Sequence, residues 1–272
     1  MNPPDGEDLP VPDGPVPSSE HGERLLDLVR VMARLRAPDG CPWDHEQTHR
    51  SLARHLLEET YETLDAIDAG DDDGLRDELG DVLLQVVFHA QIAADDGAWD
   101  VDDVAEGIVR KLIRRHPHVF GDVEVSGAAE VLTNWEKIKA DEKGGDAGAL
   151  EDDIPTSLPA LARASKVQRR AAGWGFEWKT TEGALGALRE EVGELEAAAT
   201  PDEAEEEIGD VLFAAVAVAR RHGVDPEGAL RRTIRGFADR YARFTVLAQE
   251  RGLDVEGMTE EEIRSLFREA RA

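Results

Sequence analysis

The same acidic pattern occurs twice in the sequence, and this repeat constrains the fold more than any other feature of the chain. In the first half, LEETYE at 57–62 is followed by ELGD at 78–81; in the second half, REEVGE at 189–194 is followed by EIGD at 207–210. A tryptophan-bearing loop precedes each copy, at Trp43 and at Trp178. Internal similarity of this kind indicates that one structural unit is used twice.

Apolar residues recur at spacings of three and four through most of the chain, which is typical of amphipathic helices. No stretch alternates convincingly at period two, so we expect an all-α protein. The expected helices cover about 23–35, 51–69, 75–94, 101–115, a segment after Ser126, then 159–172, 182–199, 203–222, 226–251 and a short segment after Thr259.

The segments outside these helices predict the domain organisation. Residues 1–20 are rich in proline and acidic residues and are expected to form a disordered acidic tail. Residues 143–157 are rich in Gly, Asp and Pro and are expected to be a linker. We therefore expect two tandem helical-bundle domains, at 21–142 and 158–272, joined by that linker.

The charge balance excludes several partners. The formal net charge is −28, so a phosphate backbone or an acidic membrane surface would repel the chain, and we expect neither nucleic acid nor membrane as a partner. Cys41 is the single cysteine, which rules out an internal disulfide and makes the cytoplasm the expected compartment.

The repeated carboxylates carry the chemistry. Glu59 and Glu62 share one helix face, and Glu78 and Asp81 share a face of the next helix. Two adjacent antiparallel helices could bring all four together, which is unfavourable unless a hard cation neutralises them. Oxygen ligands of this kind suit Mg²⁺, with Mn²⁺ as an alternative.

Ordinary solvated helix faces would give the same glutamate pairs. Asp81 argues against that interpretation, because it directly precedes the apolar run Val82-Leu83-Leu84, and a carboxylate beside a buried run usually has a partner. Asp210 stands in the same place before Val211. The second occurrence favours a metal site in each half.

Basic residues suited to phosphate follow the first cluster. Lys111 and Arg115 are one helical turn apart, with Arg114 beside them. A basic last turn that complements the helix dipole would explain them too, but next to a metal site they predict a phosphate clamp. The HEQTH sequence at 45–49 matches a zinc-protease pattern but follows a loop and lacks a third ligand. The chain has no glycine-rich phosphate loop.

Together these motifs resemble the all-α nucleoside triphosphate pyrophosphohydrolases, and specifically the MazG family in its tandem-domain form. The resemblance rests on the acidic repeat, on GCPWDHEQT at 40–48, on RRHPHVF at 114–120 and on DDIP at 152–155, and it covers nearly everything beyond the acidic tail. It implies two MazG-like helical domains and a homodimer. It also implies Mg²⁺-dependent hydrolysis of nucleoside triphosphates to monophosphate and pyrophosphate, which would serve the housecleaning of nucleotide pools.

The resemblance also implies roles for individual residues. Metal ligands would be Glu59, Glu62, Glu78 and Asp81 in the first domain and Glu191, Glu194, Glu207 and Asp210 in the second. Glu62 and Glu194 would be the catalytic carboxylates that orient or deprotonate the attacking water. We assign substrate binding to Trp43, Lys111, Arg114, Arg115, Lys166, Arg169, Trp178 and Arg240.

The second domain departs from the family pattern. Positions where the family usually has phosphate-binding Lys residues hold Ala187 and Gly236, whereas Arg240 is kept, and Phe267 replaces a usual Trp. We therefore expect either that the first domain contributes more of the activity or that the second domain has an altered affinity.

Two other interpretations stay open. One is a single-substrate relative, similar to a deoxycytidine triphosphatase or a phosphoribosyl-ATP pyrophosphohydrolase. The other is a helical partner-binding protein with vestigial metal sites.

Overall fold

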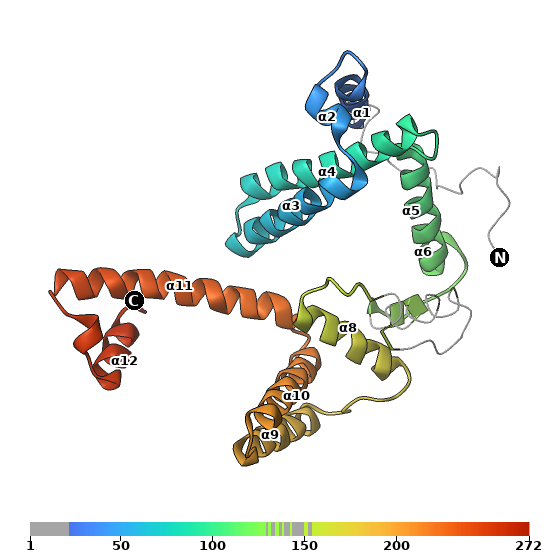
Figure 1. Ribbon diagram of the computed structural model, residues 1–272. Coiled ribbons are helices and arrows are strands. Elements are labelled where there is room, and N and C mark those ends of the chain that lie inside the picture. The colour runs from blue at the N-terminus through green and yellow to red at the C-terminus, as the bar shows by residue number, and fades with distance from the viewer. Residues whose placement is uncertain are drawn as a thin grey trace. The chain divides into compact units, whose positions relative to one another are not determined.

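The computed structural model describes residues 22–128, 130–131, 134–135, 138, 142, 150–151 and 154–271. Regular structure in these residues is entirely helical, which confirms the all-α prediction. The chain divides into two compact units, unit 1 (residues 1–145) and unit 2 (residues 146–272) (Figure 1). The expected acidic tail, most of the expected linker and much of the helix expected after Ser126 lie outside the described residues.

Unit 1 is organised around a helical hairpin. Its elements are α1 (Glu23–Arg36), α2 (Pro42–Glu46), α3 (His49–Ala69), α4 (Asp72–Asp95), α5 (Val101–Arg115) and α6 (Pro117–Phe120). Helices α3 and α4 lie side by side, α1 packs on α4, and α5 follows the end of α4 (Figure 1). The loop expected at 37–44 contains the start of α2, a single helical turn that begins at a proline.

Capping residues define the ends of the hairpin helices. Thr48 begins α3, where its side chain accepts a hydrogen bond from the Ser51 amide and its own amide donates to the Ser51 hydroxyl. Gly70, at φ 68°, ends α3 in the left-handed conformation that glycine adopts at little cost. Asp71 then caps α4 by accepting from the Gly74 amide. This short turn makes α3 and α4 antiparallel neighbours.

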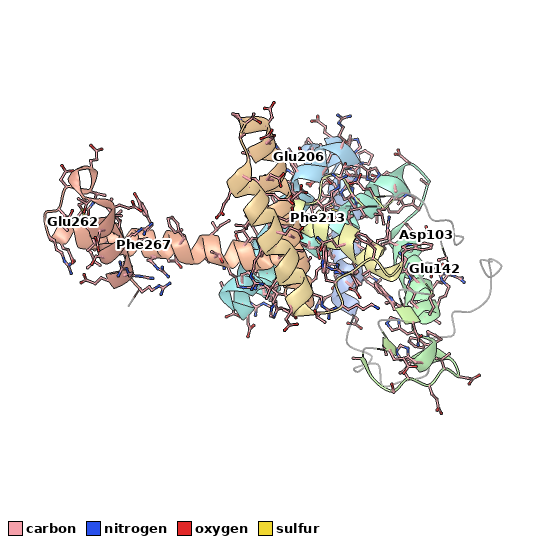
Figure 2. All side chains as sticks on the ribbon, turned by 90° about the horizontal axis from the view of Figure 1, so that it is seen from below. Asp103, Glu142, Glu206, Phe213, Glu262 and Phe267 are labelled. Carbon is pink, nitrogen blue, oxygen red and sulfur yellow. The ribbon has the colours of Figure 1, made fainter. Side chains whose placement is uncertain are left out.

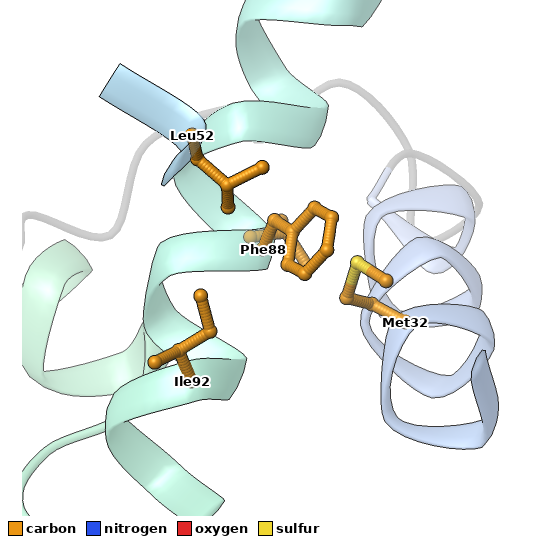
Figure 3. Packing of buried hydrophobic residues seen from close by; sticks show 5 residues of the cluster. Met32, Leu52, Phe88 and Ile92 are labelled. Carbon is orange, nitrogen blue, oxygen red and sulfur yellow. The ribbon is translucent and has the colours of Figure 1, made fainter. Parts of the chain in front are cut away.

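The core of unit 1 joins α1 to the hairpin. It contains Met32, Leu52, Val87, Phe88 and Ile92, all nearly inaccessible to solvent (Figure 3). Arg36 is also buried: its Nε donates to Asp95 over 2.7 Å, and its Nη1 donates to the Asp44 carbonyl over 2.6 Å. Because Asp44 adjoins Trp43 on α2, this buried guanidinium fixes the helical turn that carries the tryptophan.

Unit 2 repeats this arrangement and adds a second small core. Its elements are α8 (Ala160–Gly173), α9 (Thr181–Ala197), α10 (Pro201–Arg221), α11 (Pro226–Glu250), the 3₁₀ helix η1 (Val255–Gly257) and α12 (Glu260–Glu269). Helices α9 and α10 form the hairpin and α8 packs on α10, as α1 packs on α4 (Figure 1). Helix α12 packs on α11 through Phe244, Ala248, Leu266 and Ala270.

The sequence repeat is therefore also a structural repeat. Counted from the acidic residues, Leu52 of α3 corresponds to Ala184 of α9, and Val87 of α4 corresponds to Val216 of α10; all four are buried. This confirms the tandem helical architecture. In the part of the chain that the structure describes, no helix is both long and apolar enough to cross a bilayer.

Candidate metal centre

The α3–α4 hairpin brings acidic side chains of unit 1 together. Glu59 lies on α3, and Glu78 and Asp81 lie one turn apart on α4. Each of these three residues offers a carboxylate oxygen, and the three oxygens lie within 4.8 Å of one another. Glu62 is not part of this tight group, but it acts electrostatically on both Glu59 and Glu78.

The α9–α10 hairpin forms an equivalent group in unit 2. Oxygens of Glu191, Glu194 and Glu207 lie within 4.8 Å of one another. Here Asp210 is the member outside the tight group, and it still acts electrostatically on Glu191 and Glu207. Each hairpin thus unites three of the four expected ligands and keeps the fourth nearby.

Glutamates of both clusters have raised pKa values. Burial first, and then the charges of neighbouring carboxylates, raise the pKa of Glu59 above its usual value. The same two causes raise the pKa of Glu78, Glu191 and Glu207. Within the described residues, every charge that contributes to these four shifts is negative, so each cluster is a concentration of like charge that a cation would relieve.

The donor set fits a hard divalent cation. All the clustered side chains offer oxygen, the ligand type of Mg²⁺ and Mn²⁺. In addition, Oε2 of Glu207 is buried and has no hydrogen-bond partner within the described residues. A buried carboxylate oxygen without a partner is costly, and coordination to a metal would satisfy it.

The two arginines of the expected phosphate clamp in unit 1 already bind a carboxylate. Arg114 and Arg115 both donate hydrogen bonds to Glu142 (labelled in Figure 2), over 2.6 Å from Arg114 Nε and 2.5 Å from Arg115 Nη2. These bonds lower the pKa of Glu142 to about 2. The Arg115 guanidinium also lies 5.6 Å from the centroid of the Trp135 ring. Lys111, by contrast, is exposed on α5.

The expected substrate residues of unit 2 lie in two places. Arg240 lies 5.1 Å from the ring centroid of Phe267, which is on α12 (Figure 2). Lys166 and Arg169 are exposed on α8, and Arg169 is close enough to act electrostatically on Arg220. Trp178 lines a cavity beside α8 and α10.

Trp43 of α2 is the counterpart in unit 1 of Trp178. Its ring packs edge-on against His55, and the residue remains 53% exposed. The HEQTH pattern does not lie on one helix, because Gln47 and Thr48 are extended between α2 and α3. Its two histidines have separate contacts: His45 with the Arg36 carbonyl and His49 with His89.

Comparisons with known proteins identify the family. Residues 47–120 match the model of the MazG nucleotide pyrophosphohydrolase domain. A nucleoside triphosphate pyrophosphohydrolase/pyrophosphatase MazG of Thermotoga maritima is 44% identical over 252 residues, covering 93% of this chain and 97% of the relative. This chain belongs to the MazG family. Two further relatives are nucleoside triphosphate pyrophosphohydrolases. The one from Escherichia coli K12 is 44% identical and covers 90% of this chain and 95% of its own length. The one from Mycobacterium tuberculosis is 49% identical and covers 59% of this chain and 48% of its own length.

Two residues to which the sequence gives no role, one on α8 and one on α10, also lie close to the candidate site of unit 2. Gln168 and Arg220 line the same cavity as Trp178. A glutamine on the apolar face of a helix and an arginine near a helix end are weak signals, because both are common at sites without function. Their proximity follows from how α8 packs on α10, which the sequence does not display.

Proposed function

We propose that the protein hydrolyses nucleoside triphosphates to nucleoside monophosphate and pyrophosphate in a Mg²⁺-dependent reaction, and so removes unwanted nucleotides from the cellular pool. One observation carries the proposal: in each of two equivalent hairpins, carboxylate oxygens from three residues lie within 4.8 Å. The names of the MazG relatives support the same reaction class.

The carboxylates have distinct tasks in this reaction. Glu59, Glu62, Glu78 and Asp81 would hold the metal in unit 1, and Glu191, Glu194, Glu207 and Asp210 would hold it in unit 2. When bound, Mg²⁺ neutralises the phosphates and lowers the pKa of a coordinated water. Glu62, beside the tight group, is placed to accept a proton, and we assign Glu194 the same role in unit 2.

The bond changes follow from these positions. A water oxygen attacks the α-phosphorus, the catalytic carboxylate takes the proton, and the bond from the α-phosphorus to the bridging oxygen breaks. Pyrophosphate leaves with the bridging oxygen. Positive side chains stabilise the charge that develops on the leaving group, and we assign this role to Lys111, Arg114, Arg115 and Arg240, with Lys166 and Arg169 as further contacts to substrate.

A homodimer would complete these sites. In the described residues, the charges that act on the four shifted carboxylates include no Lys or Arg of the same chain. The hairpins also expose large apolar side chains next to the acidic residues: Tyr61, Leu79, Leu83 and Val86 in unit 1, and Val192, Ile208, Leu212 and Phe213 in unit 2. We propose that a second copy covers these faces and supplies the missing positive charge.

The deciding experiment is analysis of reaction products. The full chain is incubated with Mg²⁺ and each of a panel of ribo- and deoxyribonucleoside triphosphates, and the products are separated by anion exchange. We expect monophosphate and pyrophosphate from several of them; diphosphate and phosphate would refute the proposal. Turnover of a single member of the panel would instead identify a single-substrate relative.

The partner-binding alternative has its own test. If the protein were a scaffold with vestigial sites, Mg²⁺ and a nonhydrolysable triphosphate would not raise its melting temperature. We expect that they do, since a ligand that binds the folded state stabilises it. Fractionation of cells that produce the protein tests the cytoplasmic location that we propose for it.

A further inference from the structure

Unit 2 contains a cavity of about 110 Å³ between α8, α10 and the loop that joins α8 to α9. Aromatic side chains of Phe176, Trp178 and Phe213 and the small side chain of Ala217 form its apolar wall. A volume of this size has room for roughly three or four water molecules. The cavity is too small for a whole nucleotide, so only the base of a nucleotide would enter it.

The repeat explains why this space exists. In unit 1, Phe88 and Leu52 fill the core between α1 and the hairpin. Counted from the acidic residues, the corresponding positions of unit 2 hold Ala217 and Ala184. Two large side chains are thus replaced by two methyl groups, and the wall of the cavity includes one of them.

A buried acceptor without a partner lies in the wall. Gln168 is 6% exposed, and its Nε2 donates to the Phe213 carbonyl over 2.7 Å, which fixes which end of the amide is oxygen. The Gln168 Oε1 atom is buried and finds no hydrogen-bond partner in the described part of the chain. An unpaired buried oxygen of this kind is unfavourable, so a ligand with an N–H group would gain from binding beside it.

Charged groups complete the wall. Arg220 is half-buried, and burial lowers the pKa of its guanidinium although Glu177 opposes the shift. Arg221 Nη2 donates to the Lys179 carbonyl over 3.0 Å, which ties the end of α10 to the loop. The cavity thus combines an aromatic wall, guanidinium donors, and acceptors on Gln168 and Glu177.

The cavity lies at a suitable distance from the acidic cluster. Asp210 and Ala217 are on the same helix, seven residues apart, which corresponds to about 10 Å along the axis. That distance leaves space for a ribose and the first phosphate between a ring in the cavity and phosphates at the carboxylates.

We propose that this cavity binds the base of the nucleotide and prefers guanine. Guanine presents O6 and N7 as acceptors, the pair that arginine recognises most often, and Arg220 would donate to them. Its N1–H and N2–H groups are donors, for which Gln168 Oε1 and Glu177 are acceptors. Adenine would direct its N6 amino group at the guanidinium, so that one donor faces another. The inference rests on the proposed function, because it takes the ligand to be a nucleotide.

Binding of nucleoside monophosphates to the full chain, measured by calorimetry in EDTA, tests the inference without catalysis. We expect GMP to bind about tenfold or more tightly than AMP, CMP or UMP, the discrimination typical of one good arginine–guanine contact. Replacement Gln168→Met keeps the length of the side chain and removes the acceptor, and Ala217→Phe introduces the residue that unit 1 has at this position. Both should abolish the preference for GMP.

Matched controls separate loss of the site from loss of the fold. Gln249→Met and Ala242→Phe make the same changes at exposed positions of α11 and should leave GMP binding unchanged. Circular dichroism verifies folding, and Arg220→Lys replaces any variant that does not fold. Equal binding of all four monophosphates, no binding of GMP, or an unchanged preference in Gln168→Met or Arg220→Lys would overturn the inference. Failure of the proposed function has a different signature, namely no release of pyrophosphate from any triphosphate.

Discussion

Arg115 of α5 donates a hydrogen bond from Nη2 to Oε2 of Glu142 over 2.5 Å, and Arg114 shares the same carboxylate. Two guanidinium groups on one carboxylate make a charge-assisted network, and such networks are stronger than single surface pairs. The carboxylate occupies the two arginines that the sequence predicts as phosphate ligands. A phosphate group would have to compete with Glu142 for them.

Replacement Glu142→Gln should change how stability depends on acid. The pKa of Glu142 is lowered from 4.5 to about 2, so its ionised form contributes stability that is present above about pH 4.5 and is lost as the pH falls toward 2. In the variant this contribution is absent at all pH values. We expect a lower melting temperature at neutral pH and a smaller further decrease between neutral pH and about pH 3.

The control for this experiment is Glu124→Gln, which removes one exposed carboxylate from the same unit. It should reproduce the wild-type acid dependence. If Glu142→Gln and Glu124→Gln give the same curve, the network does not stabilise the protein.

Replacement Glu59→Ala should reduce pyrophosphate release more than Glu191→Ala does. Both residues belong to tight carboxylate groups, but unit 2 holds Ala187 and Gly236 where the MazG pattern usually has lysines, whereas unit 1 has Lys111. We expect a loss of about 100-fold or more for Glu59→Ala and a smaller one for Glu191→Ala. Equal losses, or collapse with Glu191→Ala alone, would contradict the predicted difference between the domains.

The sequence predicted the helices and the repeat because both depend on local periodicity. Helix bounds agree closely where caps define them, as at Gly70, whereas the single turn of α2 follows from Pro42 and lacks the length that periodicity requires. The acidic clusters were predictable because a hairpin must bring its facing turns together. The pairing of Arg115 with Glu142, 27 residues later, was not, since nothing in the spacing of charges shows where the chain returns.

The cavity of unit 2 could not be predicted from the hydrophobic pattern. It arises from side-chain volume, with Ala217 where the first half has Phe88, and a hydrophobic pattern treats the two residues alike. Only the packing of α8 on α10 shows that Gln168 lies in its wall.

Addition of Mg²⁺ should raise the melting temperature of the protein relative to EDTA. Burial first, and then the like charges of neighbouring carboxylates, raise the pKa of Glu59 and Glu191, and a bound cation would remove the repulsion between the charges. At an Mg²⁺ concentration 100 times the dissociation constant, the gain is about 2.7 kcal/mol per site. A Glu59→Gln/Glu78→Gln/Glu191→Gln/Glu207→Gln variant should lose the effect, and retention of it there would place the metal elsewhere.

Replacement Arg36→Met should destabilise unit 1 by about 2 kcal/mol, the scale of hydrogen bonds to charged groups. Its guanidinium is buried, pairs with Asp95 and binds the Asp44 carbonyl. Arg24→Met is the matched control, because Arg24 is 93% exposed in its pair with Asp27, and exposed pairs contribute little. Urea titration measures the stability of both variants, and equal unfolding midpoints would show that the buried contacts do not stabilise the protein.

Replacement of Leu83 and Leu212 together by Glu should dissociate the proposed homodimer. These side chains are 40% and 51% exposed on α4 and α10, beside the acidic residues, and a charge on each face makes burial against a second copy costly. We expect light scattering to report a dimer for the wild type and a monomer for the double variant. We expect activity to fall with dissociation, since among the described residues of one copy only negative charges act on the shifted carboxylates. Leu253→Glu, at a similarly exposed leucine outside the hairpins, should remain dimeric. A wild-type monomer with full activity would show that one copy assembles the site alone.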